Sequence, residues 1–390
     1  MLSRESTLFD ILSQPTAPFR ESYVISTFQK LFDAEKVPYF LDPIGNIVVG
    51  VKSKAEYLKL VRAKEAEPLR FFIAHTDHPG FHGVNWKSPT ELEIQWHGGS
   101  PTAGIEGSSV WLADANGLKE SGEFISAELI PSGRGISKGV VRVKRPIDIA
   151  APKLFGGFQF RAPVWKEGEL VYTKAADDLV GAFCIASIAI DFFAKAKKKR
   201  GKAKPPFLGL LSRAEEVGFI GTIGHLELGW LAQAKRPLLC VSLETSRTLP
   251  GADIGKGPVV RLGDRMTVFN TGALKVFGDL AQKVLPGQHQ KRVMDGGACE
   301  GSAATAYGIP TVGISVPLGN YHNQNFEGGP DAKVSLGPAP EFVHEKDIAG
   351  LLTLCEGLLQ PKLAWKAPFD ATRKQFKNEL KRYRPLLKQP

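Results

Sequence analysis

The sequence predicts an α/β fold: a doubly wound mixed sheet with helices on both faces, plus an inserted small all-β domain. Short apolar runs typical of buried strands alternate with helical patterns, first around residues 69–74 and again after residue 169. Between them, short alternating segments separated by Gly, Pro and Ser clusters favour a barrel or sandwich. We therefore expect the following division: a discontinuous main domain (1–79 and 169–362), an inserted β domain (80–168) and a basic C-terminal tail (363–390).

The segment before the inserted domain has the pattern of a helix, a strand pair and a buried strand. Residues 20–35 place Val24, Phe28 and Phe32 on one helical stripe. Residues 38–51 predict two strands broken by a turn at residues 42–46. The apolar run LRFFIA then predicts a strand buried on both faces.

After the inserted domain, strands and helices alternate. The predicted strands share short apolar runs, and they are LVYTK (170–174), PFLGLLS (206–212), PLLCVSL (237–243) and GIPTVGISVPL (308–318). The predicted helices cover 179–199, 222–234, 274–285 and 348–359, and the first of them has a broad apolar face. This order is typical of α/β domains.

Composition excludes several classes of protein. With 390 residues, 43% of them hydrophobic, the chain is long and apolar enough for a large core, and it has no internal repeat. Its net charge of +10 comes partly from a run of seven basic residues at 195–204, which we interpret as a solvated surface, so we expect no nucleic-acid partner. Four dispersed cysteines predict no disulfide framework. Without a secretory signal or an apolar run of 18 residues, we expect no membrane partner and a cytoplasmic location.

Histidines and carboxylates follow the ends of five predicted buried strands, where open α/β sheets gather functional groups. Imidazole and carboxylate suit zinc, cobalt or manganese. Two metals about 3.5–4 Å apart need a bridging carboxylate and terminal ligands on each side. Two histidines and three carboxylates would supply this and leave one glutamate as a general base. The strand-end residues are His75 and Asp77, Asp177 and Asp178, Glu215 and Glu216, Glu244, and Tyr321 and His322.

Asp77 has a predicted role of its own. It lies two residues after His75, so both side chains share one strand face, and its carboxylate can accept the imidazole N–H.

Several motifs, in their order along the chain, resemble those of the co-catalytic, dinuclear-metal metallopeptidases, and most closely the glutamyl-aminopeptidase and tetrahedral-aminopeptidase family. These motifs are HTDHPG, AADDLVGA, SRAEEVGFIGT, SLET, GIPTVGISVPL and YHN, with LDPIGNIVVG before them and GADIGKGPVVRLGD among them. The resemblance covers roughly residues 20–359. The inserted β unit stands where that family carries its own β domain.

The resemblance implies a zinc-peptidase-like catalytic domain that releases N-terminal residues from peptides. It implies two divalent ions per chain, zinc with cobalt or manganese as alternatives, and a metal that also takes the free α-amino group of the substrate. It further implies a homo-oligomer and a cis bond between Asp177 and Asp178. By motif, the implied roles are terminal ligands (His75, His322, Glu216, Glu244), bridging ligand (Asp177), general base (Glu215) and partner of His75 (Asp77).

The chain departs from the family pattern around the substrate. Leu179 stands where Arg is usual, His78-Pro79 replaces Glu-Gly, and Cys299-Glu300 replaces a Thr-Asp pair. Glu244 replaces the more usual Asp, as in related deacylases. The residue preference therefore does not follow from the resemblance. Two alternatives stay open: an N-acyl amino-acid deacylase or dipeptidase of the related family, and a non-catalytic binding protein on the same scaffold.

Overall fold

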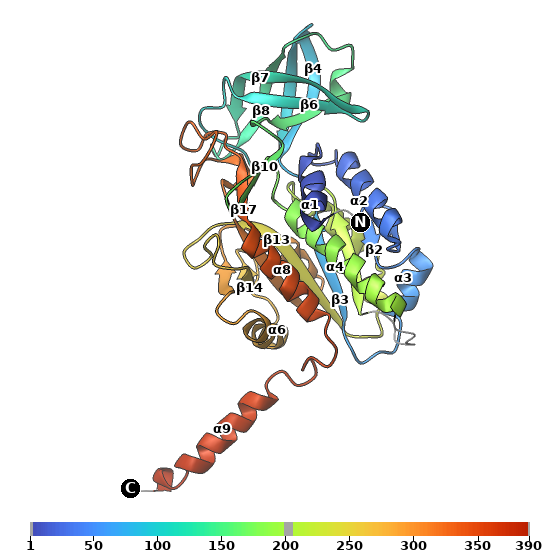
Figure 1. Ribbon diagram of the computed structural model, residues 1–390, viewed down its shortest axis with the longest axis vertical. Coiled ribbons are helices and arrows are strands. Elements are labelled where there is room, and N and C mark those ends of the chain that lie inside the picture. The colour runs from blue at the N-terminus through green and yellow to red at the C-terminus, as the bar shows by residue number, and fades with distance from the viewer. Residues whose placement is uncertain (1–2, 199–205, 389–390) are drawn as a thin grey trace.

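The computed structural model describes residues 3–198 and 206–388 (Figure 1). The predicted basic run at 195–204 is described only as far as residue 198, and the rest of it lies outside the described residues. Within the described part of the chain, no helix is both long and apolar enough to cross a membrane.

One large mixed sheet of eleven strands forms the centre of the main domain, as the sequence predicts. Its four inner strands are parallel, and each was predicted from an apolar run. Their order is β12 (Phe207–Ser212), β3 (Leu69–His75), β13 (Leu238–Arg247) and β16 (Thr311–Gly319).

Antiparallel strands extend this sheet on both sides. Beyond β12 lie β2 (Ile47–Val49) and β1 (Tyr39–Leu41), and beyond β16 lie β17 (Glu341–His344), β11 (Leu170–Thr173) and β10 (Val164–Glu167). A side branch pairs β14 (Val259–Asp264) with β16, and β15 (Gln290–Met294) with β14. Because β17 is antiparallel to both β16 and β11, the strand that precedes Asp177 runs in the same direction as the four inner strands.

Helices cover both faces of the large sheet, which confirms the doubly wound fold (Figure 1). Successive side chains of β3 alternate between two apolar clusters, with Phe72 on one face and Phe71 on the other. The Phe72 face packs against α1 (Arg4–Ser13), α2 (Ser22–Glu35), α4 (Leu179–Lys198), α6 (Thr271–Val284) and α8 (Glu345–Leu358). The Phe71 face packs against α3 (Lys54–Val61), α5 (Ile220–Glu227) and α7 (Glu300–Ala306).

The helix predicted over residues 222–234 is wrong in its second half. Helix α5 ends at Glu227, and residues 231–233 form only a short 3-10 turn. Gly229, at a φ of +66°, adopts the left-handed conformation that ends helices and that glycine adopts most readily.

The inserted segment contains a closed six-stranded barrel (Figure 1). Aromatic side chains such as Phe81, Trp96 and Phe124 fill its interior. Its strands, in order around the barrel, are β4 (Gly80–Ser88), β5 (Glu91–His97), β8 (Ile136–Val143), β7 (Gly117–Leu129), β6 (Ser109–Asp114) and β9 (Phe155–Phe158). The barrel strands therefore end at Phe158, and β10, inside the predicted 80–168 segment, pairs with β11 in the large sheet.

The basic C-terminal segment contains a helix that the sequence analysis did not predict. Helix α9 (Asp370–Tyr383) projects away from the rest of the molecule (Figure 1). None of its residues is buried. It therefore buries no side chain against the main domain.

Candidate metal centre

The structure brings the predicted strand-end residues together at one edge of the large sheet. His75 is the last residue of β3, and Glu244 lies near the end of the neighbouring β13. The Glu215–Glu216 pair follows β12, and His322 follows β16. The carboxyl ends of parallel strands meet at the same edge, so residues far apart in sequence face one another there.

Asp177 lies between the two histidines. Its Oδ1 is 3.4 Å from Nε2 of His75, and its Oδ2 is 3.7 Å from Nε2 of His322. Around His75, Nε2 lies 3.8 Å from Oε2 of Glu215 and 3.9 Å from Oε1 of Glu244. On the other side, Nε2 of His322 is 3.0 Å from Oε2 of Glu216. The cluster thus has two halves that share Asp177.

The five residues predicted as ligands share a second property: each has a buried nitrogen or oxygen without a hydrogen-bond partner. An unpartnered polar atom is costly in a protein interior, and a metal ion would satisfy it. Glu215, whose side chain is 8% exposed, has no such enclosed atom. The five atoms are Nε2 of His75, Oδ1 of Asp177, Oε1 of Glu216, Oε2 of Glu244 and Nε2 of His322.

Donor spacing also fits divalent cations. Ligand atoms of His75, Asp177 and Glu216 lie within 4.8 Å of one another, and so do those of His75, Glu215 and Glu244. Imidazole with carboxylate is a donor set for zinc, cobalt or manganese. Distance alone does not separate Glu215 from Glu244 as a ligand, but the enclosed, unpartnered oxygen favours Glu244.

Burial and mutual repulsion work against negative charge in this cluster. Burial raises the pKa of Asp177, Glu215 and Glu244 well above that of an ordinary carboxyl group, and raises the pKa of Glu216 to about 8. Burial also lowers the pKa of His322 to about 4, which leaves its imidazole neutral. Cations bound among these groups would supply the missing countercharge.

Asp77 holds the site in a different way from the one predicted. Its Oδ1 accepts the backbone N–H of Glu215 at 2.9 Å, and its Oδ2 accepts that of Glu216 at 3.1 Å. Its carboxylate is 3.6 Å from Nδ1 of His75, whereas its backbone carbonyl lies only 3.1 Å from that nitrogen. The predicted contact between the carboxylate and the imidazole is therefore longer than a hydrogen bond, and the backbone carbonyl lies closer to the same nitrogen.

The sequence analysis missed Glu341, which connects two of the predicted ligands. This buried carboxylate opens β17, and its Oε2 accepts the backbone N–H of Ala176 at 2.7 Å and of Asp177 at 3.1 Å. Its Oε1 accepts the backbone N–H of His322 at 2.9 Å. A charged residue at the start of a short strand is the signal that the sequence offers.

His78 supports the backbone beside the cluster. Its Nδ1 lies 2.9 Å from the Asp177 carbonyl and its Nε2 lies 3.2 Å from Oδ1 of Asn323. The next bond in the chain, between Asp177 and Asp178, is cis, as the resemblance implied.

The barrel reaches the cluster through Gly99. A Cβ atom at this position would overlap the imidazole of His322, so only glycine fits between the barrel loop and the ring. The same loop is held by Gln324, whose side-chain amide donates to the Ser100 carbonyl. The barrel therefore contributes directly to the surroundings of His322.

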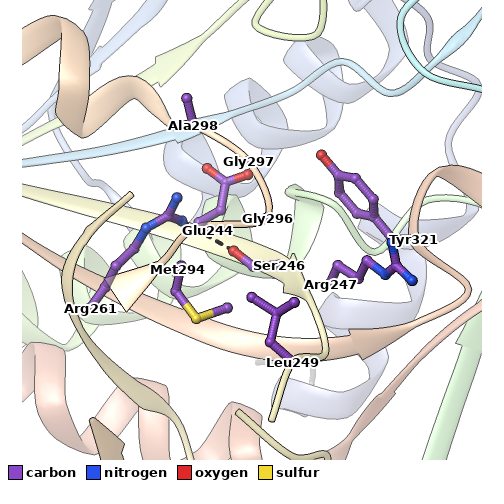
Figure 2. A pocket seen from close by; sticks show the side chains of 10 residues that line it. All are labelled: Glu244, Ser246, Arg247, Leu249, Arg261, Met294, Gly296, Gly297, Ala298 and Tyr321. Atoms are coloured by element: carbon purple, nitrogen blue, oxygen red, sulfur yellow. Dashed lines mark hydrogen bonds between the residues drawn. The ribbon is translucent and has the colours of Figure 1, made fainter. Parts of the chain in front are cut away.

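A narrow pocket adjoins Glu244 and contains two arginines (Figure 2). Arg261 is only 2% exposed, and its Nη1 donates to Oγ of Ser246 at 3.1 Å. Its Nε is buried and has no partner. Arg247 also lines the pocket, as does Tyr321, whose ring stacks on that of His322. A cationic wall thus lies next to the cluster.

Comparisons with known proteins identify a similar family. Residues 155–326 match the family model of the M42 glutamyl aminopeptidases. No curated protein matches the sequence.

Solved structures share the fold over nearly the whole chain. The TET1 peptidase of Pyrococcus horikoshii superposes with a TM-score of 0.70 at 19% identity, covering 92% of this chain and 100% of that one. The TET aminopeptidase of a marine-sediment Thaumarchaeota archaeon gives 0.69 at 16% identity, covering 92% and 97%. An aminopeptidase of Desulfurococcus kamchatkensis gives 0.69 at 16% identity, covering 94% and 98%. The likeness establishes the shared fold. The family match confirms the resemblance to glutamyl aminopeptidases and supports a metal-dependent aminopeptidase.

Proposed function

We propose that this metal-dependent aminopeptidase binds two divalent cations at the strand-end cluster and uses Glu215 as its general base. The observation that carries the proposal is the set of five enclosed, unpartnered donor atoms around Asp177. One cation would be held by His75 and Glu244, the other by Glu216 and His322, with one Asp177 oxygen for each. The two Asp177 oxygens support this division, since each faces a different imidazole.

The proposed reaction gives separate roles to Glu215, Asp77 and Glu341. Two bound cations supply Lewis acidity toward the attacking water and the scissile carbonyl. Glu215 takes a proton from the water and returns it to the amine of the leaving peptide. Asp77 fixes the backbone of Glu215 and Glu216. Their adjacent side chains can then point in different directions, with Glu215 as the base and Glu216 as a metal ligand. Glu341 fixes the backbone of Asp177 and His322.

We take zinc as the cation and a homo-oligomer as the working form. The mixed imidazole and carboxylate set supports zinc, with cobalt and manganese as alternatives. The TET1 structure is described as assembling into a tetrahedron or a large octahedral shell, which supports an assembly here. We assign the predicted 80–168 domain to assembly or substrate access.

The function is tested by metal content and substrate range together. Purified chain should hold about two divalent ions, and removal by chelation should abolish hydrolysis of aminoacyl amides until the ions return. Peptides with an acetylated N-terminus should resist cleavage, because an aminopeptidase needs the free α-amine. Cleavage of the acetylated peptide alone would favour a deacylase, and the absence of any hydrolysis would favour a binding protein.

The arginine pocket supports a preference for an acidic N-terminal residue. The pocket shares Glu244 with the proposed metal site, so its mouth lies next to the reacting bond, and its free volume of about 20 Å³ can take only the tip of a side chain. Arg261 offers a buried, unpartnered N–H, which a carboxylate would satisfy. A hydrogen bond to a charged group contributes about 1.5–3 kcal/mol. The pocket therefore favours glutamyl or aspartyl substrates over neutral ones.

Replacement of Arg261 should remove this preference. Arg261→Met is expected to lower kcat/KM for a glutamyl anilide about 10- to 100-fold, which corresponds to the loss of one charged hydrogen bond, with little change for an alanyl anilide. Arg265→Met, at an exposed arginine outside the pocket, is the matched control. Equal losses on both substrates would assign Arg261 a structural role instead.

Glu341 should act on metal affinity through the backbone. Glu341→Gln weakens the acceptor of three N–H groups, so metal affinity is expected to fall about 10- to 100-fold, as it does when residues that orient ligands are changed. Competition with a chelator measures this change. Glu345→Gln, four residues later and more exposed, should leave affinity unaltered. An unchanged affinity in Glu341→Gln would contradict the positioning role.

A further inference from the structure

Helix α9 carries an apolar stripe that the described residues of the main domain leave exposed. Phe376, Leu380 and Tyr383 recur at spacings of four and three residues, which places them on one face of α9. They are 64%, 56% and 47% exposed. Anchors at this spacing are typical of a helix that binds in an apolar groove.

Charges flank this stripe asymmetrically. Lys377, Lys381 and Arg384 each follow a stripe residue and lie along one side of it. Glu379 precedes Leu380 on the other side. The stripe is narrow, as in helix–helix seams, whereas a helix that lies on a membrane needs a broader apolar face. Two copies of α9 would also bring their basic flanks together, so pairing of α9 with itself is unfavourable.

The main domain offers a matching cavity of about 360 Å³ between α5, the start of β13 and the start of β16. Leu226, Leu231 and Ile309 line it with apolar side chains. Arg236 also lines it, at 3% exposure, and donates to the Glu67 carbonyl through Nε and Nη2. Its Nη1 is buried and has no partner. The cavity thus combines an apolar lining with one unsatisfied cationic donor.

The cavity lies at the edge of the sheet from which the tail leaves the molecule. Arg70, at the start of β3, donates to the carbonyls of Leu358 and Gln360, which lead into the tail. Leu238, at the start of the adjacent β13, lines the cavity. From this edge α9 extends outward instead of folding back (Figure 1). Its stripe is therefore presented to another molecule.

We propose that α9 docks into this cavity of a second copy of the chain. The stripe fills the apolar cavity, Glu379 pairs with Arg236 of that copy, and the basic flank faces the exposed Glu227 beside Leu226. Such an exchange is heterologous, since two different surfaces meet, and it builds closed rings or larger assemblies. It is independent of the proposed hydrolytic function.

Cysteine cross-linking tests the contact in the full-length protein. One tagged copy carries Ala232→Cys, and a second copy with a different tag carries Leu380→Cys. Ala232 is exposed and lines the cavity. The two copies are mixed and oxidised. The four native cysteines are buried and should not compete. A disulfide between the two tagged chains is expected. Its absence, or a disulfide formed only within a chain carrying both substitutions, would overturn the proposal.

Assembly provides the second readout. Leu380→Asp should weaken self-association at least about tenfold in light scattering, as loss of an interface anchor does. Asn378→Asp adds the same charge on the opposite face of α9 and should leave association intact. Both variants should keep the wild-type circular dichroism spectrum and melting temperature, which shows that they are folded. Equal association of the two variants would refute the docking.

Discussion

Glu215→Gln is expected to lower kcat by about 10²–10⁴ while the metal content stays at the wild-type value. Glutamine keeps the shape of the side chain but cannot accept a proton, and general acid–base groups contribute rate factors of this size. Glu215 also lacks the enclosed, unpartnered oxygen that marks the five proposed ligands, so its loss should not empty the site. Steady-state kinetics and metal analysis of the same preparation measure both quantities.

Glu216→Gln is the matched comparison, because the two residues are adjacent and the chemical change is identical. It should lose metal as well as rate, since Oε2 of Glu216 lies 3.0 Å from Nε2 of His322 and its other oxygen is enclosed. Metal loss in Glu215→Gln with retention in Glu216→Gln would show that the roles are exchanged. Unchanged rates in both variants would contradict the hydrolytic mechanism itself.

Asp177→Asn should remove most of the bound metal and, with it, essentially all activity. Each Asp177 oxygen faces a different histidine, so the amide replaces one anionic donor oxygen and removes the charge that both cations would share. Metal analysis after gel filtration and the rate at saturating substrate provide the two measurements.

The control for Asp177→Asn is a buried aspartate in a different place. Asp347 in α8 accepts the backbone N–H groups of Gly255 and Gly257, both at 2.7 Å, so Asp347→Asn has a comparable structural cost. It should keep its metal. Full metal occupancy in Asp177→Asn would exclude Asp177 as the shared ligand.

The strand-end residues could be predicted from sequence because a short apolar run followed by a polar residue defines where a buried strand ends. His75 and Glu244 lie at or near the ends of inner parallel strands, Glu216 and His322 follow such strands, and the sheet brings these ends to one edge. Asp177 follows β11, which joins the sheet only through an antiparallel strand. Strand β11 nevertheless runs in the same direction as the inner strands, so Asp177 could also be predicted as a strand-end residue.

Residues that act through the backbone could not be predicted in this way. Glu341 orients Asp177 and His322 by accepting their N–H groups, and any residue type can supply an N–H, so no side-chain pattern records the contact. Asp77 was found because of its spacing from His75, but its main partners are likewise backbone donors far along the chain. Helix α9 was not predicted, because the basic composition of residues 363–390 is typical of a solvated tail.

The contact between Gly99 and His322 places the barrel directly beside a proposed metal ligand and restricts which residues can stand at position 99. A barrel taken from another protein would need glycine at this position, because a side chain there would displace the imidazole of His322. Conversely, a tilt of the barrel would be transmitted to the ring through a contact with no intervening side chain to absorb it. The position of the barrel and the position of the His322 imidazole are therefore mechanically linked in this protein.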